Sequence, residues 1–138
     1  MEFKFTFDDK EYILNEGNLE YFVNDEENPI KDIDEKKIIE ILHNSENVEF
    51  TKAFFDFPCE TCNEGVAEKK KFFDFLGFNF YIYTKNEKYV ISTLDKEYEG
   101  LSFKRLMKSG KVDNSYIVMI NVCKHCGSYS IEIEEFEV

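Results

Sequence analysis

The chain has 138 residues, of which 43 % are hydrophobic and 33 % are charged, and its formal net charge at pH 7 is −12. This length fits one ordinary domain, and the hydrophobic share excludes wholesale disorder. The excess of 29 acidic over 17 basic residues argues against a protein that binds duplex nucleic acid, because phosphates are held by clustered Lys and Arg. Fifteen Phe, eight Tyr and no Trp favour β-structure, since aromatic side chains fit half-buried pleated surfaces.

Neither a membrane span nor an export signal is evident in the sequence. No stretch approaches the run of about 18 apolar residues that a membrane helix needs. Residues 1–8 show no basic segment followed by an apolar run, and no small-residue cleavage site follows them. We therefore expect a cytoplasmic protein that has no membrane partner. In a reducing cytoplasm, paired cysteines are more often metal ligands or catalytic thiols than structural disulfides.

The N-terminal part of the chain predicts three strands followed by a helix. Residues 2–7 alternate between Phe and polar side chains, which indicates a strand with one buried face. Residues 11–15 are expected to return as the second strand of a hairpin, and residues 19–23 form a further short strand. After an acidic loop, Asp32 can cap a helix together with Glu35, three residues later. The apolar stripe of this helix consists of Ile38, Ile39, Ile41 and Leu42.

The remainder of the chain predicts mostly strands, with one more helix. The stretch 66–75 is compatible with either a helix or the opening of a strand. The other predicted elements are, in order, strands over 48–57, 78–84 and 89–94, a helix over 102–108, and strands over 115–122 and 129–136. The sequence therefore predicts an α+β fold with a mainly antiparallel sheet and about two helices, built as a single domain over residues 1–138.

All four cysteines lie in two Cys-x-x-Cys motifs, Cys59 with Cys62 and Cys123 with Cys126. Two such pairs with no cysteine left over are the pattern of a tetrahedral site in which four thiolates bind Zn²⁺ at about 2.3 Å. Four thiolates around one Zn²⁺ add a charge of about −2. Because a catalytic zinc usually keeps an open coordination position, four cysteines predict a closed, structural Zn²⁺ site.

The two motifs share their context, because an apolar strand leads into each and a strand follows the second at once. This arrangement resembles the zinc-ribbon superfamily, in which two Cys-x-x-Cys knuckles at hairpin tips face each other across one zinc. Residues 63–122 separate the pairs, whereas compact sites of this kind have about 15–20 residues between them. We therefore expect an insertion over 63–122. The whole chain is also similar to members of a small bacterial family of this length to which no function is assigned, and this likeness supplies no activity.

Dithiol redox chemistry is the main alternative for the cysteines. The sequence Cys123-Lys-His-Cys126 resembles the active site of thioredoxin-like oxidoreductases, where a helix starting at the first cysteine lowers the thiol pKa. The residues after Cys126 alternate as a strand instead, so this structural context is missing. His125 lies inside its motif, and we expect its side chain to point outward.

The segment 65–111 is the only basic part of this acidic protein, with ten basic and six acidic residues. Part of the excess is Lys69-Lys70-Lys71, and the rest lies in and just after the predicted helix 102–108, where Lys104, Arg105, Lys108 and Lys111 are candidates for binding a partner. Lys104, Lys108 and Lys111 would share one helical face at this spacing. Solvated surface charge is the simpler interpretation of such runs.

No Gly-rich phosphate loop, nucleophile elbow or His-Glu-x-x-His helix occurs in the sequence, so it identifies no catalytic residue and predicts no enzyme. We expect a non-enzymatic, cytosolic zinc-binding module that docks another protein. The alternatives are a thiol-based redox or stress sensor that uses the same cysteines, and a nucleic-acid accessory protein that acts through residues 65–111, although the net charge disfavours nucleic acid as a partner.

Overall fold

The computed structural model describes residues 1–137 and has the predicted α+β architecture, with two α-helices and eight strands in this range. Two short 3₁₀ helices, η1 and η2, complete the set. In chain order the elements are β1 (Phe3–Phe7), β2 (Lys10–Leu14), η1 (Glu16–Asn18), β3 (Leu19–Val23), α1 (Glu35–His43), β4 (Thr51–Phe55), β5 (Phe73–Lys85), β6 (Lys88–Ser92), η2 (Lys96–Tyr98), α2 (Phe103–Lys108), β7 (Asn114–Cys123) and β8 (Tyr129–Glu135).

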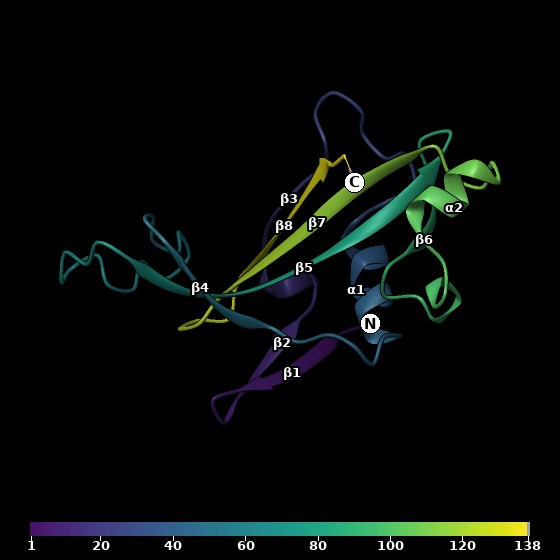
Figure 1. Ribbon diagram of the computed structural model, residues 1–138. Helices are drawn as coiled ribbons and strands as arrows, with labels where there is room; N and C mark the ends of the chain where they lie inside the picture. Colours follow the sequence, from purple (N-terminus) through teal and green to yellow (C-terminus); the bar gives the residue numbers. More distant parts are fainter. Residues whose placement is uncertain (138) are drawn as a thin grey trace.

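Six strands form one large sheet in the order β3-β8-β7-β5-β4, and β6 also pairs with β5. Strands β1 and β2 form a separate hairpin. All pairings are antiparallel except that of β3 with β8, so the prediction of a mainly antiparallel sheet is confirmed. Strands β5 and β7 pair from Phe75↔Cys123 to Thr84↔Asn114 and form the long central ladder seen in Figure 1.

Two tight hairpins lie where the sequence predicts them. The turn between β1 and β2 places Asp8 and Asp9 in the left-handed region, with φ of 49° and 64°. The turn between β5 and β6 does the same with Asn86 and Glu87, with φ of 52° and 69°. Two consecutive left-handed residues give a turn whose twist matches that of the strands it joins, and Asn and Asp adopt this conformation more readily than most residues.

Helix α1 begins later than predicted, because Asp34 rather than Asp32 is its N-cap. The Asp34 side chain accepts a hydrogen bond from the Lys37 backbone N–H at 2.9 Å. Asp32 instead accepts one from the Tyr89 backbone N–H at 2.8 Å. That bond holds the preceding loop against β6, so the first helical turn starts only at Glu35.

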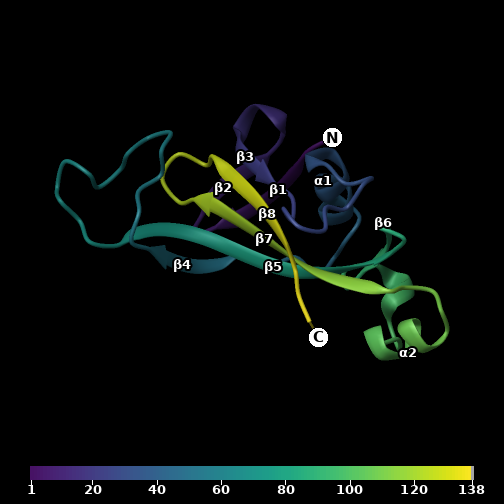
Figure 2. The same cartoon turned by 90° about the horizontal axis from the view of Figure 1, so that it is seen from above.

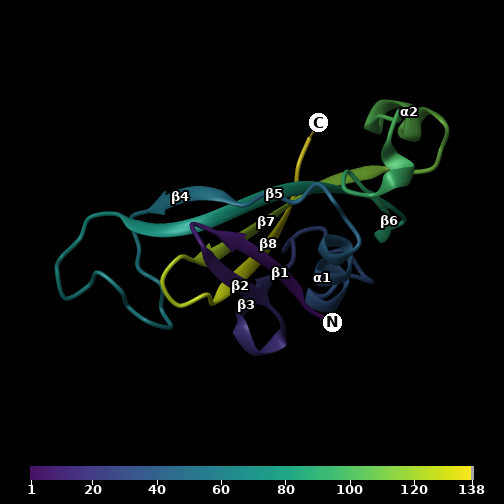
Figure 3. The same ribbon diagram turned by 90° about the horizontal axis from the view of Figure 1, so that it is seen from below.

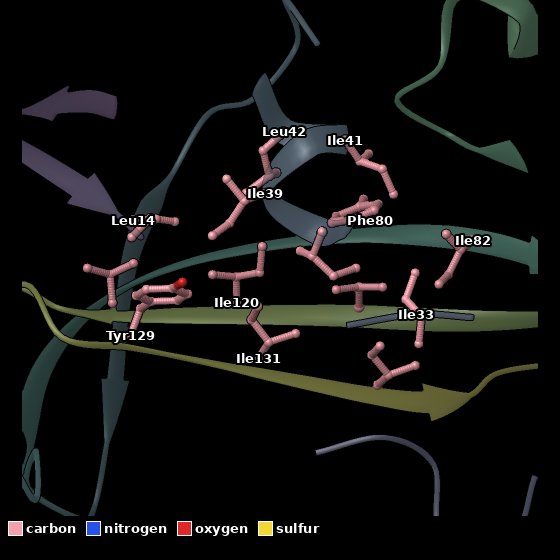
Figure 4. Close-up of a cluster of buried hydrophobic side chains, with 14 of the residues drawn as sticks. Leu14, Ile33, Ile39, Ile41, Leu42, Phe80, Ile82, Ile120, Tyr129 and Ile131 are labelled. Carbon is pink, nitrogen blue, oxygen red and sulfur yellow. The ribbon is translucent and has the colours of Figure 1, made fainter. Parts of the chain in front are cut away.

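The main core lies between α1, the β1–β2 hairpin and one face of the large sheet. In Figure 4, Ile39 of α1 points toward the sheet residues Phe80 and Ile120, and Leu42 belongs to the same buried cluster. Burying a side chain of this kind stabilises the fold by about 1.5–3 kcal/mol. The whole predicted stripe of the helix is buried: Ile38, Ile39, Ile41 and Leu42.

Within residues 1–137, buried side-chain clusters cover the opposite face of the sheet only at its two ends. Figures 2 and 3 show α1 and the β1–β2 hairpin on one side of the sheet and α2 on the other. At one end of this second face, Tyr83 packs with Phe103 and Leu106 of α2. At the other end, Phe75 packs with Cys59 and Cys123. The middle of this face lies between these two small clusters.

Element boundaries differ from the prediction around the first cysteine pair. Strand β4 is confined to residues 51–55, and the chain from 60 to 70 makes successive turns before β5 starts at Phe73. The ambiguous stretch 66–75 is thus turn followed by strand. The description as one domain with an insertion over 63–122 stays a prediction. In the large sheet, residues 63–122 supply β5 and most of β7, which are its two central strands.

Candidate metal centre

The four cysteines lie at the ends of two adjacent hairpins. The connection between β4 and β5 carries Cys59 and Cys62, and Cys123 and Cys126 lie where β7 turns into β8. Because β5 pairs with β7 in the register Phe75↔Cys123, the two hairpin ends lie side by side at the same end of the sheet. The four sulfur atoms all lie within 4.8 Å of one another. The fold thus joins motifs that are about 60 residues apart, as the four-cysteine pattern requires.

Both motifs have the same backbone geometry. The Asn63 N–H donates to the Cys59 carbonyl at 2.8 Å, and the Gly127 N–H donates to the Cys123 carbonyl at 2.9 Å. Asn63 and Gly127, each four residues after the first cysteine of its motif, have left-handed φ values of 53° and 82°. The two loops are therefore equivalent knuckles, as in the zinc-ribbon arrangement that the sequence resembles.

Backbone N–H groups converge on the first cysteine of each knuckle. The Cys59 sulfur accepts hydrogen bonds from the backbone of Thr61 and Cys62. The Cys123 sulfur accepts them from the corresponding residues, His125 and Cys126. Such donors stabilise a thiolate, which is the form that binds a metal.

The sulfur positions fit a tetrahedral metal ion. A metal–sulfur distance of 2.3 Å in a regular tetrahedron separates neighbouring sulfurs by about 3.8 Å. The Cys59 and Cys126 sulfurs are 3.7 Å apart, and those of Cys62 and Cys123 are 3.8 Å apart. These distances are far longer than a disulfide bond of about 2.05 Å, and all four cysteines are free thiols. Four sulfurs in this arrangement suit Zn²⁺ or iron.

The protonation of the cluster follows from burial and from the neighbouring donors. Burial raises the pKa of the Cys59 thiol, but the Ser128 hydroxyl and the knuckle N–H groups lower it more, from 9.0 to about 7. Burial raises the pKa of Cys123 far above its ordinary value, and the neighbouring Cys59 raises it further; burial also raises the pKa of Cys62. Of these three thiols, Cys59 therefore loses its proton most readily. The charge of a bound divalent cation favours the thiolate form of its ligands and deprotonates them.

Ser128 is a part of the centre that the sequence analysis missed. Its hydroxyl lies 3.2 Å from the sulfur of Cys59 and 3.2 Å from that of Cys126, one sulfur from each knuckle. It can therefore donate to either sulfur and orient it toward a metal. The residue directly follows Gly127 at the end of the second knuckle, but no spacing rule singles out a serine there.

His125 lies outside the sulfur cluster, as expected. Its side chain is 59 % exposed, and its Nε2 atom is 3.5 Å from a carboxylate oxygen of Glu64, just beyond the first knuckle. This contact joins the two knuckles from outside. Because the pair is exposed, it contributes little to stability.

The β1–β2 hairpin contacts the second knuckle and holds its backbone in place. The Tyr12 hydroxyl donates to the Lys124 carbonyl at 2.7 Å, and the Lys10 ammonium donates to the His125 carbonyl at 2.6 Å. Lys124 in turn lies 3.7 Å from the Asp8 carboxylate in the hairpin turn. The sequence predicts this hairpin but contains no signal of where the hairpin docks.

The fold separates the basic residues of the 65–111 segment. Lys69-Lys70-Lys71 precede β5, whereas α2 packs on Tyr83 near the other end of that strand. At a rise of about 3.3 Å per residue, the two groups are on the order of 30 Å apart. Helix α2 ends at Lys108, so the predicted helical face shared with Lys111 does not form; the chain turns at Gly110, with φ of 77°. The exposed candidates at this end are Lys104, Arg105, Lys108 and Lys111.

Comparisons with known proteins identify one family for this chain. Within residues 1–137, no helix is both long enough and apolar enough to cross a membrane. No curated protein matches the chain, and no solved structure matches it. One family model does match, over residues 3–138. This finding confirms the likeness to a family without assigned function, and the chain belongs to the family described as "Protein of unknown function (DUF3785)".

Proposed function

We propose that this protein is a non-enzymatic, cytosolic module in which a structural Zn²⁺ ion joins two hairpin ends, and that it acts by docking another protein. The ligands of the zinc are Cys59, Cys62, Cys123 and Cys126. The observation that carries the zinc assignment is the sulfur geometry. Distances of 3.7 and 3.8 Å between sulfurs of different knuckles match a tetrahedral four-thiolate site.

A structural role for the ion follows from the donor set. Four sulfurs complete a tetrahedron and leave no position for a substrate or a water molecule. Within residues 1–137, no second cluster of three or more Cys, His, Asp or Glu side chains has the geometry of a metal site. A fully coordinated ion with no neighbouring metal site supports a structural role for the zinc rather than a role as a Lewis-acid catalyst.

The knuckle end of the sheet needs a source of stability besides its own apolar packing. The main core contains 19 buried residues, whereas the cluster at the knuckles contains three: Cys59, Phe75 and Cys123. So small a cluster buries too little apolar surface to hold the turns over residues 60–70 in place. Because structural zinc binding is linked to folding, the ion supplies the missing stability there.

A redox sensor that uses the same cysteines is the second candidate, and one observation favours it. Cys126 is exposed, whereas Cys59 and Cys123 are buried, so an oxidant can reach one sulfur of the cluster first. Against this role, the second knuckle leads into strand β8 and not into a helix that would activate a thiol.

The experiment that separates these roles measures zinc release and partner retention on the same sample. Tagged protein from its native cells is exposed to mild peroxide, and released zinc is followed with a colorimetric chelator. A docking module keeps its zinc and retains one defined protein partner before and after treatment. Release of zinc within minutes, reversed by a thiol reductant together with a reversible change in partner retention, contradicts the docking role and establishes the sensor.

A further inference from the structure

On the face of the large sheet opposite α1, the uncovered middle forms a groove with a volume of about 920 Å³. It lies between the α2 cluster and the first knuckle, and residues from β4, β5, β7 and β8 line its floor. Figures 2 and 3 show no helix over this part of the face. With strands about 4.8 Å apart, a floor of four strands is about 14 Å wide, which accommodates one extended peptide and its side chains.

The groove is hollow because its floor carries small and polar side chains. Along the central row of the sheet, Thr51, Gly77, Asn121 and Ser130 lie side by side on adjacent strands. Gly77 has no side chain, and Ala53 on the neighbouring strand is also small. The amide of Asn121 and the hydroxyl of Thr51 offer hydrogen bonds to the backbone of an extended ligand. A floor of this kind suits a peptide better than an apolar small molecule.

Aromatic rings form the wall of the groove nearest the knuckles. Phe55 and Phe57 stack with their centroids 5.0 Å apart, and Phe75 meets Phe55 edge-on at 5.1 Å. Phe57 remains 50 % exposed although it belongs to this stack. An exposed ring in a rigid aromatic cluster provides a ready anchor for an apolar or cationic side chain.

All the charges in the groove lining are negative. Among residues 1–137, four glutamates line it and no Lys, Arg or His does; the four are Glu20, Glu49, Glu60 and Glu132. Within residues 1–137, none of these carboxylates has an ion-pair partner. Glu20 and Glu60 lie close enough together for their charges to repel each other. A cationic ligand would relieve this repulsion.

From this charge pattern and shape we propose that the groove binds an extended Lys- or Arg-containing peptide segment of a partner protein, with an apolar side chain against Phe55, Phe57 and Phe75. This inference rests on the proposed docking function and names its surface and its partner class. A second copy of this chain is disfavoured, because its net charge of −12 would bring two acidic faces together. Nucleic acid is disfavoured because its phosphates would meet four carboxylates.

The test measures binding of synthetic peptides to the full-length protein by fluorescence anisotropy. The probe is a short labelled peptide in which Lys alternates with Phe. Its matched versions replace Lys by Glu, or Phe by Ser. We expect the Lys/Phe peptide to bind best, with an affinity that falls as salt rises from 50 to 500 mM. Spermine and single-stranded oligouridylate, measured as competitors, represent a small cation and an RNA.

Two variants test the location of the binding site. Gly77→Val adds bulk to the floor without backbone strain, since a Cβ there meets its nearest neighbours at 3.5 Å, and it should abolish binding. Its control is Thr6→Val, at an exposed position of β1. The double change Glu49→Gln with Glu132→Gln should weaken binding about tenfold. Its control is Glu97→Gln with Glu99→Gln, which removes the same charge outside the groove.

Three results would overturn the groove assignment. They are equal binding by the Gly77→Val variant, equal weakening by the control pair of glutamates, and absence of peptide binding up to millimolar concentration. Displacement of the peptide by spermine at equal concentration, or tighter binding of the oligouridylate, assigns a different ligand and also contradicts the proposal. Metal content is measured on every sample. Metal-loaded protein that binds no peptide refutes only the assignment of the groove as a peptide site. Protein that is folded without metal refutes the proposed function, whether or not a peptide binds.

Discussion

At the scale of single residues, the metal centre depends on more than its four sulfurs, because Ser128 bridges the two knuckles with one hydroxyl. Replacing Ser128 by Ala removes contacts of 3.2 Å to both Cys59 and Cys126. Loss of an outer-shell partner typically lowers metal affinity 10–100-fold. We expect a loss of about that size, measured by competition with a chelator of known zinc affinity. Ser45→Ala, far along the chain from the knuckles, is the control and should leave the affinity unchanged.

The cysteines themselves should differ in what their loss does to the fold. Cys59 is 5 % exposed, whereas Cys126 is exposed. Cys59→Ser and Cys126→Ser should each lower the free energy of unfolding by on the order of 5 kcal/mol, because structural zinc binding is linked to folding. Cys59→Ser should cost more, since it also buries a hydroxyl. Thermal melting and zinc content measured together check this order. Variants that melt like the parent would show that no metal stabilises the fold.

At the scale of elements, the carboxylate of Asp25 fixes the end of strand β8 to the acidic loop that precedes α1. It accepts hydrogen bonds from the backbone N–H groups of Glu135, Glu27 and Asn28. These bonds hold the pKa of Asp25 below its usual 3.8. A depressed carboxyl pKa adds stability that is complete above the unfolded-state value and is lost as the pH falls through the lower folded-state value.

Asp25→Ala should therefore lower the free energy of unfolding by about 1–2 kcal/mol at pH 7, the size expected for a few exposed hydrogen bonds. The difference between parent and variant should shrink as the pH falls below 3.8. Urea unfolding at pH 7 and at pH 3 measures both quantities. A difference that stays constant between these pH values would mean that the carboxylate charge plays no part.

The elements that could be predicted from the sequence are those with a local signal. The strict alternation of β1, the apolar stripe of α1 and the Asn86-Glu87 turn each follow from the spacing of a few neighbouring residues. The helix cap predicted at Asp32 is wrong, because the Tyr89 N–H that binds this side chain instead is 57 residues away in the sequence. The sequence predicts the strand Phe73–Lys85 only from Phe78, because its first half is paired with β4 and β7 and is not marked by alternation.

At the scale of the molecule, the four-cysteine cluster could be predicted and most of its surroundings could not. Because the chain has only four cysteines and all of them lie in the two motifs, a shared metal site can be predicted without knowledge of the fold. The docking of Lys10 and Tyr12 on the second knuckle depends on contacts more than 100 residues apart in sequence. The groove depends on which face α1 covers. Such features arise from tertiary packing, which leaves no periodic trace in the chain.

This unequal packing predicts how the molecule responds to loss of metal. Chelation should raise amide hydrogen exchange first in the knuckles and in the turns over residues 60–70, where only three buried residues form a cluster. The centres of β5 and β7, packed under α1 at Phe80 and Ile120, should exchange later. Hydrogen-exchange mass spectrometry before and after chelation gives both rates. Uniform exchange along the chain would show instead that the metal holds the whole fold as one cooperative unit.

The central claim is that one zinc ion joins the two knuckles, and the most direct test is elemental analysis combined with thiol counting on protein purified without added metal. A zinc ion shared by both knuckles predicts one zinc per chain and four thiols that react only after chelation or denaturation. A chain that contains no metal and carries a readily cycled disulfide between its cysteines would contradict the zinc site and make thiol redox chemistry the function to pursue.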